Sequence, residues 1–216
     1  MKIIFLKYPY RFFTEHDIHS EIASIASTFL EENQTLYATT LDGHTVSRIH
    51  HEYPTPFRCY MKGTQFEKYA ETEYLDVKRK TPSFRARRGH FDIVVFNQKY
   101  IVTNKIGVIS GKNYKILLDS FKQKQQPAIN LAIEVVYFPI FNHKPHLGIM
   151  KRKVDSTIQD YEKLKALIDF RYPDDTPFCE EAAMMFFSNT REKEALTTLL
   201  KSISVVDNVS LFTFIL

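Results

Sequence analysis

The stretch RRGHFDIVVFN, residues 87–97, decides how the rest of the chain is interpreted. Its β-branched and aromatic residues are typical of a buried strand, yet it contains one carboxylate, Asp92. A second stretch of the same kind, AIEVVYFP at residues 132–139, also contains one carboxylate, Glu134. The sequence therefore predicts two buried strands that each carry a single acid.

A carboxylate among apolar strand residues is costly unless it is paired, hydrogen-bonded or bound to a cation. Two such acids on neighbouring strands would also repel each other. A hard cation such as Mg²⁺, or Mn²⁺ in its place, would relieve that repulsion. We therefore expect Asp92 and Glu134 to be metal ligands. The alternative is that each acid lies on the solvent side of a half-buried strand, which alternation along a strand also allows.

The composition of the 216 residues, 44% hydrophobic and 25% charged, is that of one globular domain. Its net charge of +4 is compatible with a nucleic-acid partner without requiring one. Cys59 and Cys179 are far apart and have no metal-site spacing, so we expect free thiols in a reducing compartment. Charged residues and proline interrupt the N-terminal apolar run, and no other run approaches bilayer length. These features predict a cytoplasmic protein with no membrane partner.

A first amphipathic helix is predicted between Thr14 and about Glu32. Thr14 and Asp17 resemble a capping box, and apolar residues follow at helical spacing. His19 lies within the apolar stripe, and we interpret it as a core histidine whose hydrogen bonds are satisfied.

A second helix is predicted to begin at a capping box formed by Ser156 and Gln159, after the basic residues 151–153. Its apolar face also carries an acid, Asp160. One interpretation is a local ion pair with Lys163, three residues further along.

Between these helices, Asp42-Gly43 predicts a hairpin turn. The second arm is expected to end at Glu52, because two prolines follow in Tyr53-Pro54-Thr55-Pro56. Glu52 would then lie at a strand end near the first helix. The basic run that leads into the Asp92 strand is either a solvated loop or a set of phosphate contacts.

An insertion is expected at about residues 98–130, between the two acidic strands. After residue 177 the pattern predicts a strand, a helix and a final strand. Near-continuous apolar strands that alternate with helices predict an α/β protein whose sheet is buried on both faces.

This order of elements resembles the PD-(D/E)XK nuclease superfamily over residues 14–188. The local matches are RGHFDIVVFN for the Asp strand, AIEVVYF for the (D/E)XK strand and DYEKLKAL for the following helix. The resemblance implies one nuclease-like domain over residues 1–216. Its restriction-endonuclease-like core would be a mixed central β-sheet flanked by helices in α-β-β-β-α-β order, with a C-terminal helix and strand added. Glu52 lies where related proteins often carry an extra acid.

One position departs from the family pattern. The residue two after the second acid is a lysine in the family, where it is thought to orient or activate the attacking water, but here it is Val136. Lys163 on the following helix is the first candidate to replace it. Without a lysine in reach, the fold would serve as an inactive nuclease-like protein that binds nucleic acid or a partner protein. A third possibility is an unrelated α/β protein whose acids are structural.

The leading expectation is a Mg²⁺-dependent nuclease that hydrolyses DNA, with RNA as the alternative substrate and Mn²⁺ as another usable ion. Asp92 and Glu134 would hold the metal, Glu52 would assist them, and Lys163 would stabilise the transition state. A homodimer is also compatible with the sequence. The expected contacts to the nucleic-acid backbone are the basic residues Arg85, Arg87, Arg88, Lys151, Arg152 and Lys153.

Overall fold

The structure is a computed structural model that describes residues 14–59, 66–67, 87–103, 126–138, 147–171, 175–188, 197, 201 and 207–215. Only the backbone is described for residues 54–59, 66–67, 87–89, 147–151 and 215.

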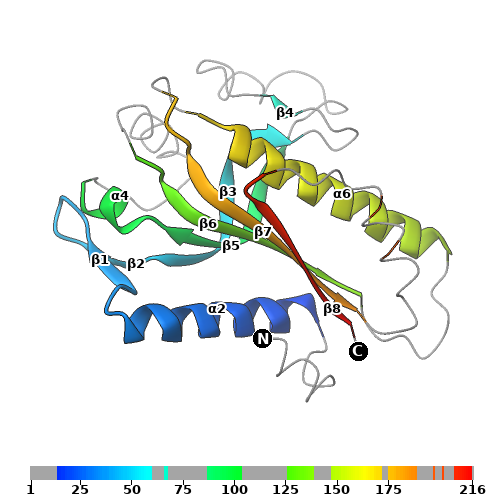
Figure 1. Ribbon diagram of the computed structural model, residues 1–216, viewed down its shortest axis with the longest axis horizontal. Coiled ribbons are helices and arrows are strands. Elements are labelled where there is room, and N and C mark those ends of the chain that lie inside the picture. Colours follow the sequence, from blue (N-terminus) through cyan, green and yellow to red (C-terminus); the bar gives the residue numbers. More distant parts are fainter. Residues whose placement is uncertain are drawn as a thin grey trace.

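The fold is α/β, with a mixed sheet between two long helices (Figure 1). The larger elements follow the expected α-β-β-β-α-β order, which confirms the predicted α/β class and helix-flanked mixed sheet. Along the chain the elements are α2 (Glu15–Glu32), β1 (Tyr37–Thr39), β2 (Thr45–Ser47), β3 (Ile49–Cys59), β4 (Phe66–Glu67), β5 (Arg87–Phe96), α4 (Gln98–Val102), β6 (Ile129–Tyr137), α6 (Leu147–Asp169), β7 (Cys179–Ser188) and β8 (Val209–Ile215).

The main sheet has six strands in the order β4-β3-β5-β6-β7-β8. Strand β3 pairs antiparallel with β4 and β5, and β5 pairs antiparallel with β6, whereas β7 joins β6 and β8 joins β7 in parallel. The predicted hairpin is formed by β1 and β2. Gly43 in its turn has a φ of +87°, a conformation that glycine adopts without a steric penalty.

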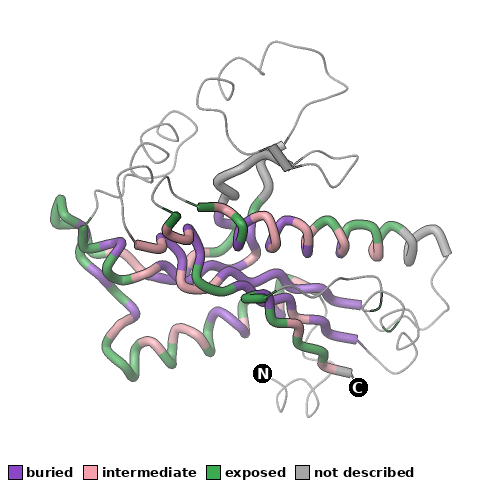
Figure 2. Tube along the Cα trace, turned by 45° about the horizontal axis from the view of Figure 1, so that its top comes forward, coloured by how far each residue is buried: buried purple, intermediate pink, exposed green. Residues whose placement is uncertain are grey.

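Helix α2 covers one face of the sheet and α6 covers the other (Figure 1). Side chains alternate between the two faces along each strand. Ile133 and Val135 of β6 therefore pack in the cluster that contains Ile18 of α2. Val136 packs in the cluster that contains Leu164 of α6. Figure 2 shows the central strands buried and both helices exposed along their outer sides, so the sheet is buried on both faces as predicted.

The N-terminus of α2 forms the predicted capping box. The Thr14 hydroxyl accepts the N–H of Asp17 at 3.2 Å, and the Asp17 carboxylate accepts the N–H of Thr14 at 2.8 Å. These two bonds satisfy amides that have no partner inside the helix. The first helix therefore begins and ends where the sequence predicts.

Two predicted boundaries are wrong. Strand β3 continues through both prolines to Cys59, because a register shift between Pro54 and Arg58 accommodates residues that lack an N–H. Helix α6 begins at Leu147, so Ser156 lies inside it and bonds the Lys153 carbonyl at 2.9 Å. The basic residues 151–153 consequently belong to the helix and do not precede it.

Several other expectations fall only partly on the described residues. Helix α4 begins the expected insertion, but residues 104–125 lie outside the described part of the chain. Most of the expected C-terminal helix lies outside it as well. Within the described part, no helix is long and apolar enough to cross a lipid bilayer.

The packing of α6 on the sheet predicts a large effect of Leu164→Ala. Leu164 is fully buried, so the substitution should lower the free energy of unfolding by about 2–5 kcal/mol through lost apolar contact and a residual cavity. Urea denaturation would measure this change. Leu41→Ala is the matched control because Leu41 is 64% exposed, and an equal loss for both variants would contradict the α6 packing.

Candidate metal centre

Three acids occupy corresponding positions on three adjacent strands. The pairing of β5 with β6 ends at Ile93 and Ile133, and the next residues of the two strands are Asp92 and Glu134. On the other side of β5, the residues that flank Glu52 pair with the residues that flank Asp92. Glu52, Asp92 and Glu134 therefore form a row across the sheet at the point where β5 and β6 separate.

Asp92 takes over a hydrogen bond of the interrupted ladder. Its Oδ2 atom accepts the backbone N–H of Val135 at 2.7 Å. A buried strand amide without an acceptor costs about 1–3 kcal/mol, so this bond stabilises the separation of β5 from β6. It also fixes the Asp92 carboxylate between the two strands.

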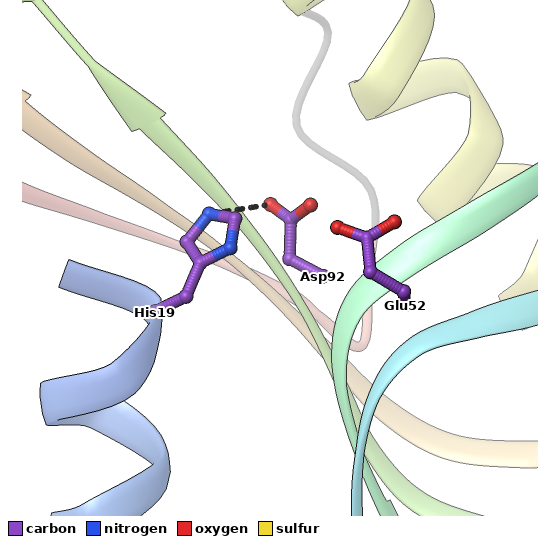
Figure 3. Close-up of side chains that lie close together, drawn as sticks. All are labelled: His19, Glu52 and Asp92. Carbon is purple, nitrogen blue, oxygen red and sulfur yellow. Dashed lines mark ion pairs between the residues drawn. The ribbon is translucent and has the colours of Figure 1, made fainter. Parts of the chain in front are cut away.

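Glu52 has an unusual backbone conformation. Its φ of +49° lies in the left-handed region, which is unfavourable for a residue with a side chain. Such conformations persist where the surrounding structure imposes them, and they are common at functional sites. Glu52 lies at the solvent side of the row, close to Asp92 (Figure 3).

A histidine of α2, His19, also extends toward these acids (Figure 3). Its Nε2 atom lies 3.4 Å from Asp92 Oδ2 and is buried without a correctly oriented hydrogen bond among the described residues. Burial lowers the pKa of His19, although the Glu15 and Glu52 carboxylates act in the opposite direction. A neutral imidazole is the form that binds metal ions.

His19 is buried, as interpreted, but its Nε2 atom has no satisfied hydrogen bond, so that part of the interpretation is wrong. The signal in the sequence was the same as for Asp92, a polar group inside an apolar pattern. Local spacing does not show which buried partner such a group meets, because that partner lies on a distant strand.

On the other face of the sheet, Lys163 of α6 reaches Glu134. The ammonium lies 2.6 Å from Glu134 Oε1 and donates to Asp160 at 3.1 Å and to the His90 carbonyl at 2.6 Å. The local pair with Asp160 and the long-range pair with Glu134 thus exist together. Val136 and Glu134 share the α6-facing side of β6, so the ammonium from α6 lies on the side to which a side chain at position 136 projects.

The charges of these groups are strongly coupled. Burial raises the pKa of Asp92 from 3.8 to about 7, although the Val135 N–H and the Lys163 ammonium oppose this effect. Burial likewise raises the pKa of Glu134 well above 4.5. Burial alone would lower the pKa of Lys163, but Glu134 and Asp160 outweigh it and raise that pKa. Lys163 therefore stays protonated, whereas the raised pKa values of Asp92 and Glu134 mean that further positive charge nearby would favour their ionised forms.

A divalent cation fits one part of this arrangement. Ligand atoms of His19, Glu52 and Asp92 lie within 4.8 Å of one another. The carboxylates suit Mg²⁺ and Mn²⁺, whereas the imidazole favours transition metals over Mg²⁺. Glu134 Oε1 has its ion pair with Lys163 but no correctly oriented hydrogen bond among the described residues, and Glu134 does not belong to the three-residue group.

The basic residues expected to hold nucleic acid are in different situations. Arg152 is exposed on α6, whereas Lys153 is half-buried and paired with Glu15. The side chains of Arg87, Arg88 and Lys151 lie outside the described residues, as does the whole of Arg85.

Comparison with known proteins finds no match. No protein-family model, curated protein or solved structure corresponds to the chain.

The buried position of Asp92 predicts a pH-dependent cost to the metal-free protein. The folded state binds a proton more tightly than the unfolded state, so this cost grows as the pH rises from 3.8 to about 7 and persists above that value. Asp92→Asn removes the ionisation but keeps an oxygen to accept the Val135 N–H. In EDTA at about pH 8 it should raise the free energy of unfolding by on the order of 1–3 kcal/mol.

Thermal denaturation of the two proteins across this pH range would measure the effect, and the gain should shrink as the pH falls toward about 4. Asp155→Asn, which removes an exposed carboxylate of α6, is the control and should change little. A variant less stable than the original protein at about pH 8 would contradict the burial cost.

Proposed function

We propose that the protein is a metal-dependent nuclease that hydrolyses phosphodiester bonds of DNA, with RNA as the alternative substrate. The observation that carries the proposal is the convergence of His19, Glu52 and Asp92 at the opening between β5 and β6. Beside this opening, Lys163 contacts Glu134. Carboxylates, an imidazole and a buried ammonium are the groups that metal-assisted phosphoryl chemistry uses.

The proposal includes a restriction-endonuclease-like core. It is supported by the order α2, β3, β5, β6, α6 and β7, by the mixed sheet, and by the position of the two acids where adjacent strands diverge. The sequence resemblance to the PD-(D/E)XK superfamily rests on those same two strands and on the following helix.

The chain's own groups have separate roles in this mechanism. Asp92 and Glu52, with His19, would hold Mg²⁺ or Mn²⁺. Such an ion supplies Lewis-acid chemistry at a phosphate oxygen and eases the deprotonation of water. Lys163 would place positive charge beside the charge that develops on the phosphate. Glu134 would keep the Lys163 ammonium oriented through their 2.6 Å ion pair.

One observation favours a second function. Lys163 is only 7% exposed and already has three oxygen partners, so it has little freedom to contact a substrate. If these contacts persist in solution, the same fold would act as an inactive nuclease-like protein that binds nucleic acid or a partner protein. Such a protein would bind DNA in a salt-sensitive way without cleaving it.

A cleavage assay separates the two functions. Single- or double-stranded DNA should be cut in Mn²⁺ or Mg²⁺ but not in EDTA, and RNA assayed beside it tests the alternative substrate. Asp92→Ala should abolish cutting by removing a metal ligand, and Lys163→Met should slow it at least about 100-fold by removing transition-state charge. Asp155→Ala on the exposed side of α6 should retain activity.

Each result bears on a different part of the proposal. DNA binding that weakens with salt, without cleavage in either metal, would support the inactive alternative. Cleavage that is unaffected by Asp92→Ala would remove this centre from the reaction. Circular dichroism of each variant would show whether lost activity reflects unfolding.

The imidazole in the ligand group predicts a preference for Mn²⁺ over Mg²⁺. His19→Ala should weaken Mn²⁺ binding by about tenfold or more and Mg²⁺ binding by less, because the nitrogen ligand favours the transition metal. Isothermal titration calorimetry with both ions would measure the two dissociation constants. His16→Ala is the matched control, since His16 is an exposed histidine of the same helix. Equal losses for both ions would show that His19 does not determine the preference.

A further inference from the structure

Glu15, in the first turn of α2, connects three elements of the fold. Its Oε2 atom accepts the backbone N–H of Tyr137 at 3.0 Å, at the end of β6. The same oxygen forms an ion pair with Lys153 of α6. Glu15 therefore connects α2 to α6, which lie on opposite faces of the sheet, and also binds the last residue of β6.

The separation of β5 and β6 explains why this contact is needed. Phe138 donates its N–H to a carbonyl of β7 at 2.8 Å, so the amides of Val135 and Tyr137 point the other way, toward β5. Pairing with β5 has already ended at that point. Asp92 accepts one of these amides and Glu15 accepts the other, each in place of a β5 carbonyl.

Glu15 also lies one helical turn before His19. Residues four apart project from the same side of a helix, so an anchor at Glu15 limits rotation and sliding of the segment that carries His19. The His19 imidazole is held 3.4 Å from Asp92 in this arrangement. Both residues of α2 thus approach the separated strands, Glu15 at an amide and His19 at a carboxylate.

The pair of Glu15 with Lys153 is only partly buried. Their side chains are 37% and 29% exposed, and ion pairs in such places contribute little stability by themselves. The pair instead orients Glu15, because the Lys153 ammonium keeps the Glu15 carboxylate directed at β6. Its loss should therefore change the position of α2 more than it changes the free energy of unfolding.

We propose that Glu15, held between the Tyr137 N–H and the Lys153 ammonium, is a positioning residue of the metal centre that sets the distance between His19 and Asp92. This inference rests on the proposed function, because it requires that the centre bind a metal. Glu15 acts through the placement of α2 and is not itself a ligand.

Mn²⁺ binding to the full chain tests the inference. Glu15→Ala should raise the Mn²⁺ dissociation constant about tenfold or more, as expected for residues that orient metal ligands. Glu15→Gln keeps an oxygen for the Tyr137 N–H and should recover most of that affinity. Lys153→Met should weaken binding in the same direction as Glu15→Ala, and Glu32→Ala, at the exposed end of the same helix, is the control.

The melting temperature of each metal-free variant and the electron paramagnetic resonance spectrum of bound Mn²⁺ complete the test. A purely structural contact would lower the melting temperature but leave the affinity and the spectrum of the folded protein unchanged. If Glu15→Ala does not fold, Lys153→Met decides the matter by the same measurements. Normal Mn²⁺ binding by folded Glu15→Ala or Lys153→Met would overturn this inference alone, whereas no Mn²⁺ binding by the original protein would overturn the proposed metal centre and this inference together.

Discussion

The separation of β5 from β6 beyond Ile93 and Ile133 is the constraint on which the rest of the centre depends. A continued antiparallel ladder would join the backbones of the two strands at Asp92 and Glu134 and leave no room between them. Because the strands part, the amide of Val135 needs another acceptor, and the Asp92 carboxylate supplies it. The group best placed to bind a metal is therefore also part of the backbone hydrogen bonding of the sheet.

The same arrangement places carboxylates where burial makes their ionised forms unfavourable. Glu134 is 2% exposed and Asp92 is partly buried, and burial raises the pKa of both. Lys163 offsets part of this cost through its ion pair with Glu134. Lys163 also acts on Asp92, but burial outweighs it and keeps the pKa of that carboxyl raised. A divalent cation held by His19, Glu52 and Asp92 would add positive charge there, and its binding would stabilise the folded state by linkage.

The two long helices contribute different chemistry from opposite faces of the sheet. Helix α2 brings the His19 imidazole, and α6 brings the Lys163 ammonium. Val136, two residues after Glu134 on β6, packs in the core against α6 and offers no charge. A residue on the helix that covers a strand face can deliver its charge to the same side of that strand, so Lys163 places an ammonium beside Glu134 although β6 has no lysine there.

The sequence by itself determined the features that local chemistry controls. Apolar periodicity identified the acid-bearing strands and the buried face of α6, while a capping box and a turn glycine identified the start of α2 and the hairpin. Local rules failed where tertiary contacts override them: β3 continues past its prolines, and α6 begins well before Ser156. Only the tertiary structure decided that His19 meets Asp92 and that Lys163 meets Glu134. The reason is that desolvation obliges a buried polar group to have a partner, but the packing of distant elements selects which partner it has.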